Sequence, residues 1–196
     1  LRGLTILPGM IAHFDVSRER SLRAIEEAME QDQRIYLVTQ SNVDREDPTQ
    51  EDLYRMGIVA DIKQVVRLQN DVVRILVDGI SRAKLLGFTG RKKYLEAEFC
   101  YCDSNADSLP EDLKEAMLLG VREAFHRYAA VIGKISKELI RQIDQYEDLE
   151  KLIDYVTNNL PVSYELKQQV LEAEDINDRY QVIVSLLLSQ VEVISI

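Results

Sequence analysis

The chain has 196 residues, of which 46% are hydrophobic and 30% charged, and its net charge is -10 at pH 7. This composition is typical of a globular protein with one large domain or two small ones. No apolar run approaches the roughly 20 residues that span a bilayer, which excludes a transmembrane helix, and the acidic charge argues against a nucleic-acid-binding protein. The one short basic cluster, Arg91-Lys92-Lys93, falls in a predicted loop.

The first thirty residues are predicted to form two extended pieces and a helix. We expect a short strand over 1–7, a break at Pro8-Gly9 and a second extended piece over 10–16. Ser17 is a good N-cap for the helix predicted over 18–31. The apolar stripe of that helix consists of Leu22, Ile25, Ala28 and Met29. From this opening pattern we expect no signal peptide, and the first residue is Leu rather than Met.

The most regular pattern lies between 58 and 88 and predicts a long hairpin. Apolar residues alternate with polar ones, as in a strand with one buried face. The apolar parity of the first strand is Ile58, Ala60, Ile62, Val66 and Leu68. A turn at Gln69-Asn70-Asp71 leads into a second strand from Val73, in which Gly79 predicts a bulge or sharp bend. A bent hairpin is how a small sheet curls into a barrel, so we place it at the centre of a β-rich domain.

Shorter elements flank this hairpin. A strand over 35–39 and a polar, acidic loop over 41–52 precede it, and an alternating strand over 94–101 follows it. The composition then changes to the linker-like segment DSNADSLPED, which begins at Asp103. We therefore expect a β-rich domain over 1–103 and a helical domain over 104–196.

The second half of the chain contains only helical patterns. We expect helices over 113–132, from Ser136 as N-cap through 143, over 146–160, from Ser163, and from 176 to at least 194. The stripe of the last helix is Tyr180, Ile183, Val184, Leu187, Leu188, Val191 and Ile194. Part of it has heptad spacing, so the helix either packs on the bundle or continues as a coiled coil. The chain stops inside this pattern without a C-cap, so we expect a piece of a longer protein.

Residues that typically perform chemistry are sparse. Gly133-Lys134 resembles the end of a phosphate-binding loop, but Tyr128 stands where that loop needs glycine. The only histidines, His13 and His126, fit structural or surface positions. Cys100 and Cys102 are too close in sequence for a disulfide and lack further metal ligands, which favours reduced cysteines in a cytoplasmic protein. The residue types thus predict a binding domain with no catalytic residue, metal or cofactor.

Several short motifs follow one another in a recognisable order. In the first half these are Leu1-Arg2-x-Leu4, Leu7-Pro8-Gly9-Met10, Ser17-Arg18-Glu19-Arg20-Ser21, Ala24-Ile25-Glu26-x-Ala28-Met29, Gln40, Asp52-Leu53-Tyr54-x-x-Gly57, Val59-Ala60 and Val77-x-Gly79-x-x-Arg82-Ala83. In the second half they are Leu160-Pro161-Val162-Ser163 and Lys167-Gln168-x-Val170-Leu171-Glu172. Together they resemble the N-terminal domain of Lon, the ATP-dependent AAA+ protease, over nearly the whole chain.

This resemblance implies an α+β fold, a PUA-like pseudo-β-barrel with one helix followed by an α-helical bundle that ends in a long helix. It implies recognition of unfolded or damaged polypeptides and their delivery to downstream AAA+ and Ser-Lys protease domains. Those domains, and the ATP and Mg that they use, are absent from this chain. The parent is expected to be a homo-hexamer, whereas this piece alone is expected to be a monomer or weak dimer.

A receptor for unfolded chains needs an exposed apolar patch or an open sheet edge. The candidate residues are Leu7, Pro8, Met10 and Ile11, where a Pro-Gly break interrupts an apolar stretch and Met10 supplies a flexible contact. The alternative is that these residues fill the barrel core. Three other functions stay open: a PUA-like nucleic-acid-binding module, an assembly or spacer domain without substrate contact, and an enzyme whose site is assembled only in space.

Overall fold

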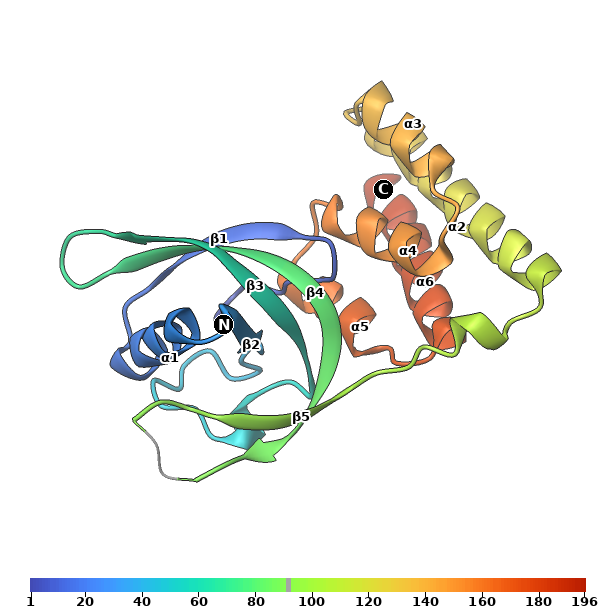
Figure 1. Ribbon diagram of the computed structural model, residues 1–196. Helices are drawn as coiled ribbons and strands as arrows, with labels where there is room; N and C mark the ends of the chain where they lie inside the picture. Colours follow the sequence, from blue (N-terminus) through green and yellow to red (C-terminus); the bar gives the residue numbers. More distant parts are fainter. Residues whose placement is uncertain (91–92) are drawn as a thin grey trace. The chain divides into compact units, whose positions relative to one another are not determined.

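The computed structural model describes residues 1–90 and 93–196, which form two compact units, Leu1–Cys102 (unit 1) and Asp103–Ile196 (unit 2) (Figure 1). Two residues of the predicted basic cluster, Arg91 and Lys92, lie outside the described residues. Unit 1 contains the strands and one α-helix, and the other α-helices of the described chain belong to unit 2. This arrangement confirms the predicted α+β class.

Unit 1 is built on an antiparallel sheet that curls around one helix (Figure 1). Its strands are β1 (Ile11–Val16), β2 (Arg34–Leu37), β3 (Met56–Arg67), β4 (Val73–Phe88) and β5 (Ala97–Tyr101). β3 and β4 form the predicted hairpin, β2 pairs with β3, and β1 and β5 pair with successive parts of β4. The core between the sheet and α1 (Glu19–Glu30) contains Ile6, Ala12, Ile25, Ala28, Leu37, Ile58, Ala60, Ile62, Ile75 and Val77.

Two irregularities bend the hairpin, and the sequence predicted one of them. Ala60 pairs with Gly79 while Val59 pairs with Ser81, so Ile80 is the extra residue of the bulge expected at Gly79. A second shift leaves Lys63 unpaired between Ile62 and Gln64. An inserted residue reverses which side chains face the core. The predicted burial is therefore wrong beyond this point: Val65 packs on the core, and the expected core residues Val66 and Leu68 are exposed.

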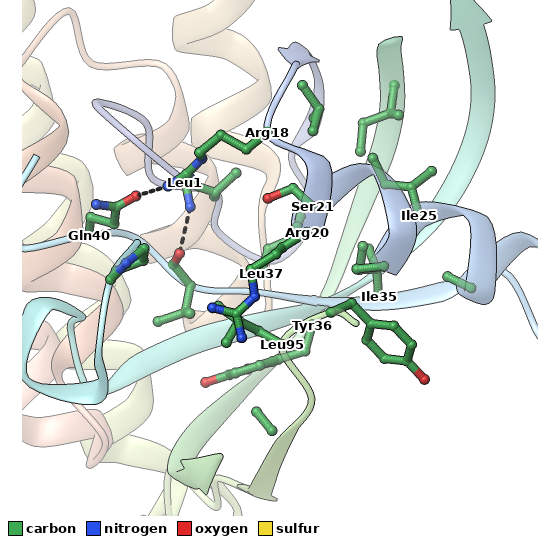
Figure 2. A pocket seen from close by; sticks show the side chains of 18 of the residues that line it. Leu1, Arg18, Arg20, Ser21, Ile25, Ile35, Tyr36, Leu37, Gln40 and Leu95 are labelled. Carbon is green, nitrogen blue, oxygen red and sulfur yellow. Dashed lines mark hydrogen bonds between the residues drawn. The ribbon is translucent and has the colours of Figure 1, made fainter. Parts of the chain in front are cut away.

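The first seven residues do not form the strand predicted over 1–7. They run beside the segment that follows β2, where the backbone nitrogen of Leu1 donates to the Val38 carbonyl at 2.8 Å (Figure 2) and the Gln40 N–H donates to the Leu1 carbonyl at 2.8 Å. The Thr39 hydroxyl donates to the Leu4 carbonyl at 2.7 Å. These bonds join the N-terminal segment to residues 38–40, which directly follow β2.

The start of α1 also differs from the prediction. The N-cap position is occupied by Arg18 rather than Ser17, and no side chain caps the first turn. The Arg18 side chain instead reaches the loop that follows β2, where it donates to Gln40 Oε1 and to the Glu46 carbonyl. A tertiary contact thus determines where the helix begins, in place of the local serine cap.

Unit 2 is a bundle of α2 (Glu111–Ile132), α3 (Lys137–Gln145), α4 (Leu149–Asn158), α5 (Tyr164–Glu172) and α6 (Ile176–Ile194). Gly133 ends α2 in the left-handed conformation, and the Ser136 hydroxyl accepts from the Leu139 N–H at 3.1 Å, which confirms the predicted cap of α3. Of the predicted stripe of α6, Ile183 and Leu187 are buried, and Tyr180, Val184, Leu188 and Val191 are half-buried. The other buried residues of the helix are Ile176, Arg179 and Leu186. Its last apolar residues, Val193 and Ile194, are exposed.

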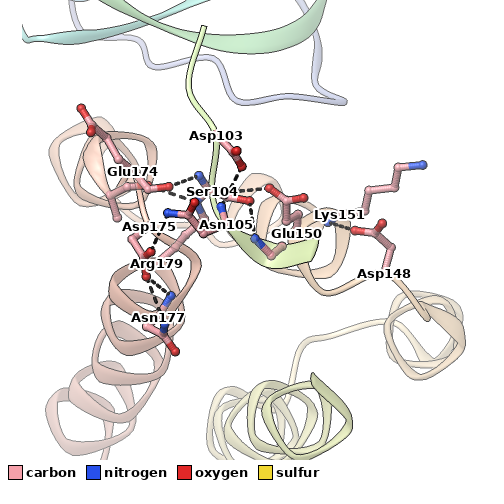
Figure 3. A network of polar contacts seen from close by, with 12 residues as sticks. Asp103, Ser104, Asn105, Asp148, Glu150, Lys151, Glu174, Asp175, Asn177 and Arg179 are labelled. Carbon is pink, nitrogen blue, oxygen red and sulfur yellow. Dashed lines mark hydrogen bonds and ion pairs between the residues drawn. The ribbon is translucent and has the colours of Figure 1, made fainter. Parts of the chain in front are cut away.

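The segment predicted as a linker is bound into unit 2 (Figure 3). The Ile176 N–H donates to the Ser104 carbonyl at 2.8 Å, and the Asn105 amide donates to the Asp175 carboxylate at 3.1 Å. The Asn105 amide and the backbone N–H of Asn177 hold the pKa of Asp175 below its ordinary value. We call these contacts the clasp, because they join the start of unit 2 to the start of its last helix.

A buried arginine stands beside the clasp (Figure 3). The Arg179 side chain is 2% exposed and donates to the backbone carbonyls of Ala173 and Glu174, at 3.1 and 3.0 Å. A third nitrogen lies 3.3 Å from the Glu150 carboxylate on α4. A buried guanidinium needs such partners, since an unpaired buried charge is strongly unfavourable. Arg179 therefore ties α4 and the α5–α6 connection together.

Candidate functional site

An open groove of about 970 Å³ runs along α1 in unit 1 (Figure 2). Residues from both ends of the helix line it, including Arg18, Ser21, Ile25, Ala28 and Gln31. Their spacing of three or four residues places them on one helix face. The opposite walls come from residues 1–4, from β2 and the loop after it, and from residues 94–97. The groove therefore follows the whole length of the helix.

The floor of the groove is apolar. The apolar residues that line it include Leu1, Leu4, Phe14, Ile25, Ile35, Leu37, Leu53 and Leu95. Several of them also pack on the core of unit 1, so the sheet holds them in place. An open apolar cleft in a folded domain is a usual place for a ligand or a peptide to bind.

One wall is a fixed aromatic side chain. The Tyr36 hydroxyl donates to the Ala83 carbonyl at 2.9 Å, and its ring stacks on Phe99 with 5.0 Å between the ring centroids. The ring lies over Gly57, where a β-carbon would be 2.7 Å from the Tyr36 ring. Gly57 is therefore required for this placement, and Tyr36 gives the groove a rigid aromatic edge.

Two arginines from distant parts of the chain meet where α1 begins. Arg2 and Arg18, which we call the arginine pair, both donate to Gln40 Oε1, at 3.4 and 2.8 Å. Arg2 also donates to the Arg45 carbonyl at 2.7 Å, and Arg18 to the Glu46 carbonyl at 3.1 Å. Gln40 is buried and keeps its oxygen toward the pair because its amide group donates to the Asn42 and Arg45 carbonyls.

The electrostatic environment of the pair is positive. Burial and the nearby Arg2 lower the pKa of Arg18, and Asp47 acts in the opposite direction. The Asp47 carboxylate itself lies 2.5 Å from Arg20, with which it forms an ion pair. Within residues 1–90 and 93–196, neither Arg2 nor Arg18 forms an ion pair of its own. The groove thus offers an apolar floor and, where α1 begins, two arginines that form no ion pair within the described residues.

The four predicted substrate-binding residues lie away from this groove. Leu7 is fully buried, as the core alternative for this segment expected, and cannot contact a ligand at the surface. Pro8 and Met10 are half-buried. Ile11 is 68% exposed at the start of β1, and it pairs with Asp78, two residues before the 42% exposed Ile80. Ile11 and Ile80 therefore form a small exposed apolar area on neighbouring strands.

Sequence reasoning did not predict the arginine pair or Gln40 as a site. These residues come from positions 2, 18 and 40, and each is separately an ordinary polar residue. Only the closure of the N-terminal segment against the loop after β2 brings them together. No motif or spacing in the sequence carries that information.

Two further features, a metal-binding cluster and a membrane-spanning helix, are absent from the described residues. In the described part of the chain, no three His, Cys, Asp or Glu side chains are placed to hold a metal ion. His126 Nε2 lies 2.7 Å from the Asp144 carboxylate on the surface of unit 2, and neither Cys100 nor Cys102 is in a disulfide. Across the same residues, no helix has the length and hydropathy needed to cross a membrane.

Comparisons with known proteins agree on one family. Residues 1–189 match the model of the ATP-dependent protease La (LON) substrate-binding domain. The chain is 36% identical over its whole length to the Lon protease of Lachnoclostridium phytofermentans, 34% to that of Clostridioides difficile and 30% to Lon protease 1 of Bacillus subtilis. It spans about a quarter of the length of each, 24%, 25% and 25%.

Two solved structures share the fold at low sequence identity. The N-terminal domain of Lon protease from Mycobacterium avium complex matches 96% of this chain with a TM-score of 0.77 and 19% identity, and 95% of that domain is covered. The Lon N-terminal domain protein from Xanthomonas campestris matches 94% of this chain with a TM-score of 0.62 and 12% identity, also with 95% of it covered. The sequence matches and the fold thus point the same way.

Proposed function

Since the chain belongs to the family of Lon substrate-binding domains, we propose that it binds unfolded polypeptide segments in the groove along α1. Membership confirms the predicted resemblance, and with it the expectation that this piece is the non-catalytic part of a larger protease. The single observation that carries the proposal is the open apolar groove, because unfolded chains differ from folded ones in exposing apolar side chains.

The dimensions of the groove suit a short extended segment. α1 has 12 residues, which corresponds to about 18 Å of helix. An extended chain advances about 3.3 Å per residue, so roughly five residues can lie along the groove. A contact of that size is weak and tolerant of sequence, as a receptor for many unfolded proteins requires.

The function of the whole protein follows as part of the same proposal. We propose that the bound segment passes to AAA+ and Ser-Lys protease domains elsewhere in a cytoplasmic parent, where ATP and Mg act. In a homo-hexamer, six weak grooves would act together and raise the apparent affinity through avidity. The isolated chain is expected to be a monomer or weak dimer, and light scattering would reveal a stable hexamer if that expectation is wrong. We propose no nucleic-acid ligand, given the net charge of -10.

The residues first predicted from the sequence provide a second, smaller contact. We propose that Ile11, with Pro8 and Met10 beside it, adds an apolar contact outside the groove. Leu7 is left out because its side chain is fully buried. Replacement Ile11→Ser should weaken binding only two- to threefold, since a single exposed side chain gives a small area.

The groove is tested by filling it. Ala24 lines the groove, so Ala24→Phe should weaken binding of a labelled, reduced and carbamidomethylated lysozyme about tenfold, measured by fluorescence anisotropy. Glu26→Phe adds the same side chain to the exposed face of α1, outside the groove, and should leave affinity unchanged. Native lysozyme should not bind. Equal affinities of the two variants would mean that the groove is not the site, and no binding at all would favour an assembly or spacer role.

A further inference from the structure

The arginine pair carries two positive charges at one end of the groove. Arg2 and Arg18 meet at the same oxygen of Gln40, and neither forms an ion pair within the described residues. The neighbouring Arg20 differs, because it pairs with Asp47 at 2.5 Å. Two guanidinium groups held close together repel one another, and an anion between them would remove that repulsion. The pair therefore has the charge of a receptor for an anionic group.

The unused donors of the pair have the right geometry for a carboxylate. Both hydrogen bonds that Arg18 donates leave from Nη1, so in the described structure its Nε and Nη2 donate to no protein atom. These two N–H groups point the same way and form the fork that binds both oxygens of a carboxylate. Arg2 uses Nε and Nη2, which leaves Nη1 as a third donor. A carboxylate can therefore be bound without breaking any contact already present.

The pair stands at one end of the groove rather than along its side. Arg18 occupies the N-cap of α1, whereas the apolar lining continues past Ile25 toward Gln31 (Figure 2). Behind the pair stands the loop after β2, whose Arg45 and Glu46 carbonyls accept from the two arginines. A chain that lies in the groove with an anionic group on the arginines thus meets a wall there. An anion at the very end of the ligand fits this position.

We propose that the groove recognises the C-terminus of an unfolded polypeptide, with its terminal carboxylate on Arg2 and Arg18 and its last apolar side chains on the groove floor. This inference rests on the proposed function, because it assigns a specificity to the same groove. Gln40 is a positioning residue in this scheme, since it holds both arginines but has no remaining role toward the ligand. Recognition of a chain end by fixed donors is a known mode of peptide binding.

Three versions of one peptide test the proposal on the 196-residue chain. A short, fluorescein-labelled peptide of Ala, Leu and Phe is made with a free C-terminal carboxylate, with a C-terminal amide, and as the amide with one internal Asp. The free acid should bind at least tenfold more tightly than the amide, because two charge-assisted hydrogen bonds are lost in the amide. The internal Asp should recover little of that difference, and added NaCl should reduce the difference.

Variants assign the effect to the arginines. Arg18→Gln and Arg2→Gln should each reduce the ratio of acid affinity to amide affinity, whereas Arg18→Lys should retain that ratio only in part. Arg23→Gln is the matched control, because it removes one positive charge from the same helix at a residue that does not line the groove and already pairs with Glu19. Circular dichroism identifies any variant that fails to fold. If Arg18→Gln fails to fold, the acid preference of Arg2→Gln tests the proposal.

The outcomes separate this inference from the function on which it rests. Equal binding of acid and amide would overturn the carboxylate site but leave the apolar groove in place as a receptor. A preference for the acid that survives both arginine variants would also overturn it. If the internal-Asp peptide binds as well as the free acid, the site recognises acidic side chains and the C-terminal assignment is wrong. Failure of all three peptides to bind would contradict both proposals.

Discussion

Gly79→Ala is expected to lower the free energy of unfolding of unit 1 by about 3 kcal/mol. A β-carbon at this position would lie 2.5 Å from the Leu7 carbonyl oxygen and 2.8 Å from Cδ1 of Ile58. The Leu7 carbonyl cannot move away freely, because it accepts from the Met10 N–H at 3.1 Å in the turn beside it. The strand must shift instead, which breaks the bonds between Gly79 and the Gly9–Met10 backbone, at 2.8 and 2.9 Å.

Gly87→Ala is the matched control for this prediction. Gly87 is in the same strand, and the nearest atom to its added β-carbon is Gln50 Oε1 at 3.6 Å. This substitution should change stability by less than about 0.5 kcal/mol, since the new methyl group meets only ordinary contacts. Urea denaturation, combined with hydrogen exchange of the β3 and β4 amides, measures the effect within unit 1. Equal stabilities of the two variants would refute the steric explanation of the bulge.

Arg179→Met is expected to lower the free energy of unfolding of unit 2 by about 3 kcal/mol. Methionine keeps much of the volume of the arginine side chain, so the loss of stability measures the contribution of the polar contacts. The Ala173 and Glu174 carbonyls lose their donor, and Glu150 loses its cationic partner. The stability of Arg179→Lys should fall between those of the unchanged chain and Arg179→Met, because one ammonium group cannot reach three separated acceptors.

Arg141→Met provides the comparison for the buried arginine. The Arg141 side chain is 64% exposed and pairs with Glu138 one turn away on α3. Exposed pairs of this kind contribute little, so we expect a change below about 0.5 kcal/mol. Thermal denaturation followed by helical circular dichroism distinguishes the two variants. A loss at Arg141 as large as that at Arg179 would show that burial is not the cause.

Periodic elements of this chain were predictable from the sequence, because their signals are local. The hairpin turn, the bulge at Gly79 and the Ser136 cap each depend on a residue with a distinctive backbone or side-chain preference. The bulge at Lys63 has no such signal, since nothing in Ile62-Lys63-Gln64 marks an extra residue. One unpredicted insertion was enough to reverse the expected burial of the far end of the strand.

The remaining errors come from contacts between distant residues. The N-terminal segment was predicted to be a strand, but it bonds to the loop after β2 through separate backbone and side-chain contacts. Ser17 has the intrinsic preference for an N-cap, yet Arg18 takes that position while its side chain reaches Gln40. The candidate site consists of these non-local contacts. The sequence thus predicted a binding domain and its family, whereas the groove and the arginine pair have no local signal in it.

The clasp has a consequence for the order in which the two units fold during synthesis. All strand pairings of unit 1 are complete at Tyr101, so we expect this unit to fold as soon as its last strand leaves the ribosome. Unit 2 must wait, because Asn105 binds Asp175, which is 70 residues further along the chain. Until α6 has been translated, the helices of unit 2 expose apolar faces. A nascent chain interrupted in this interval would carry a finished receptor followed by the kind of unfolded segment that such a receptor binds.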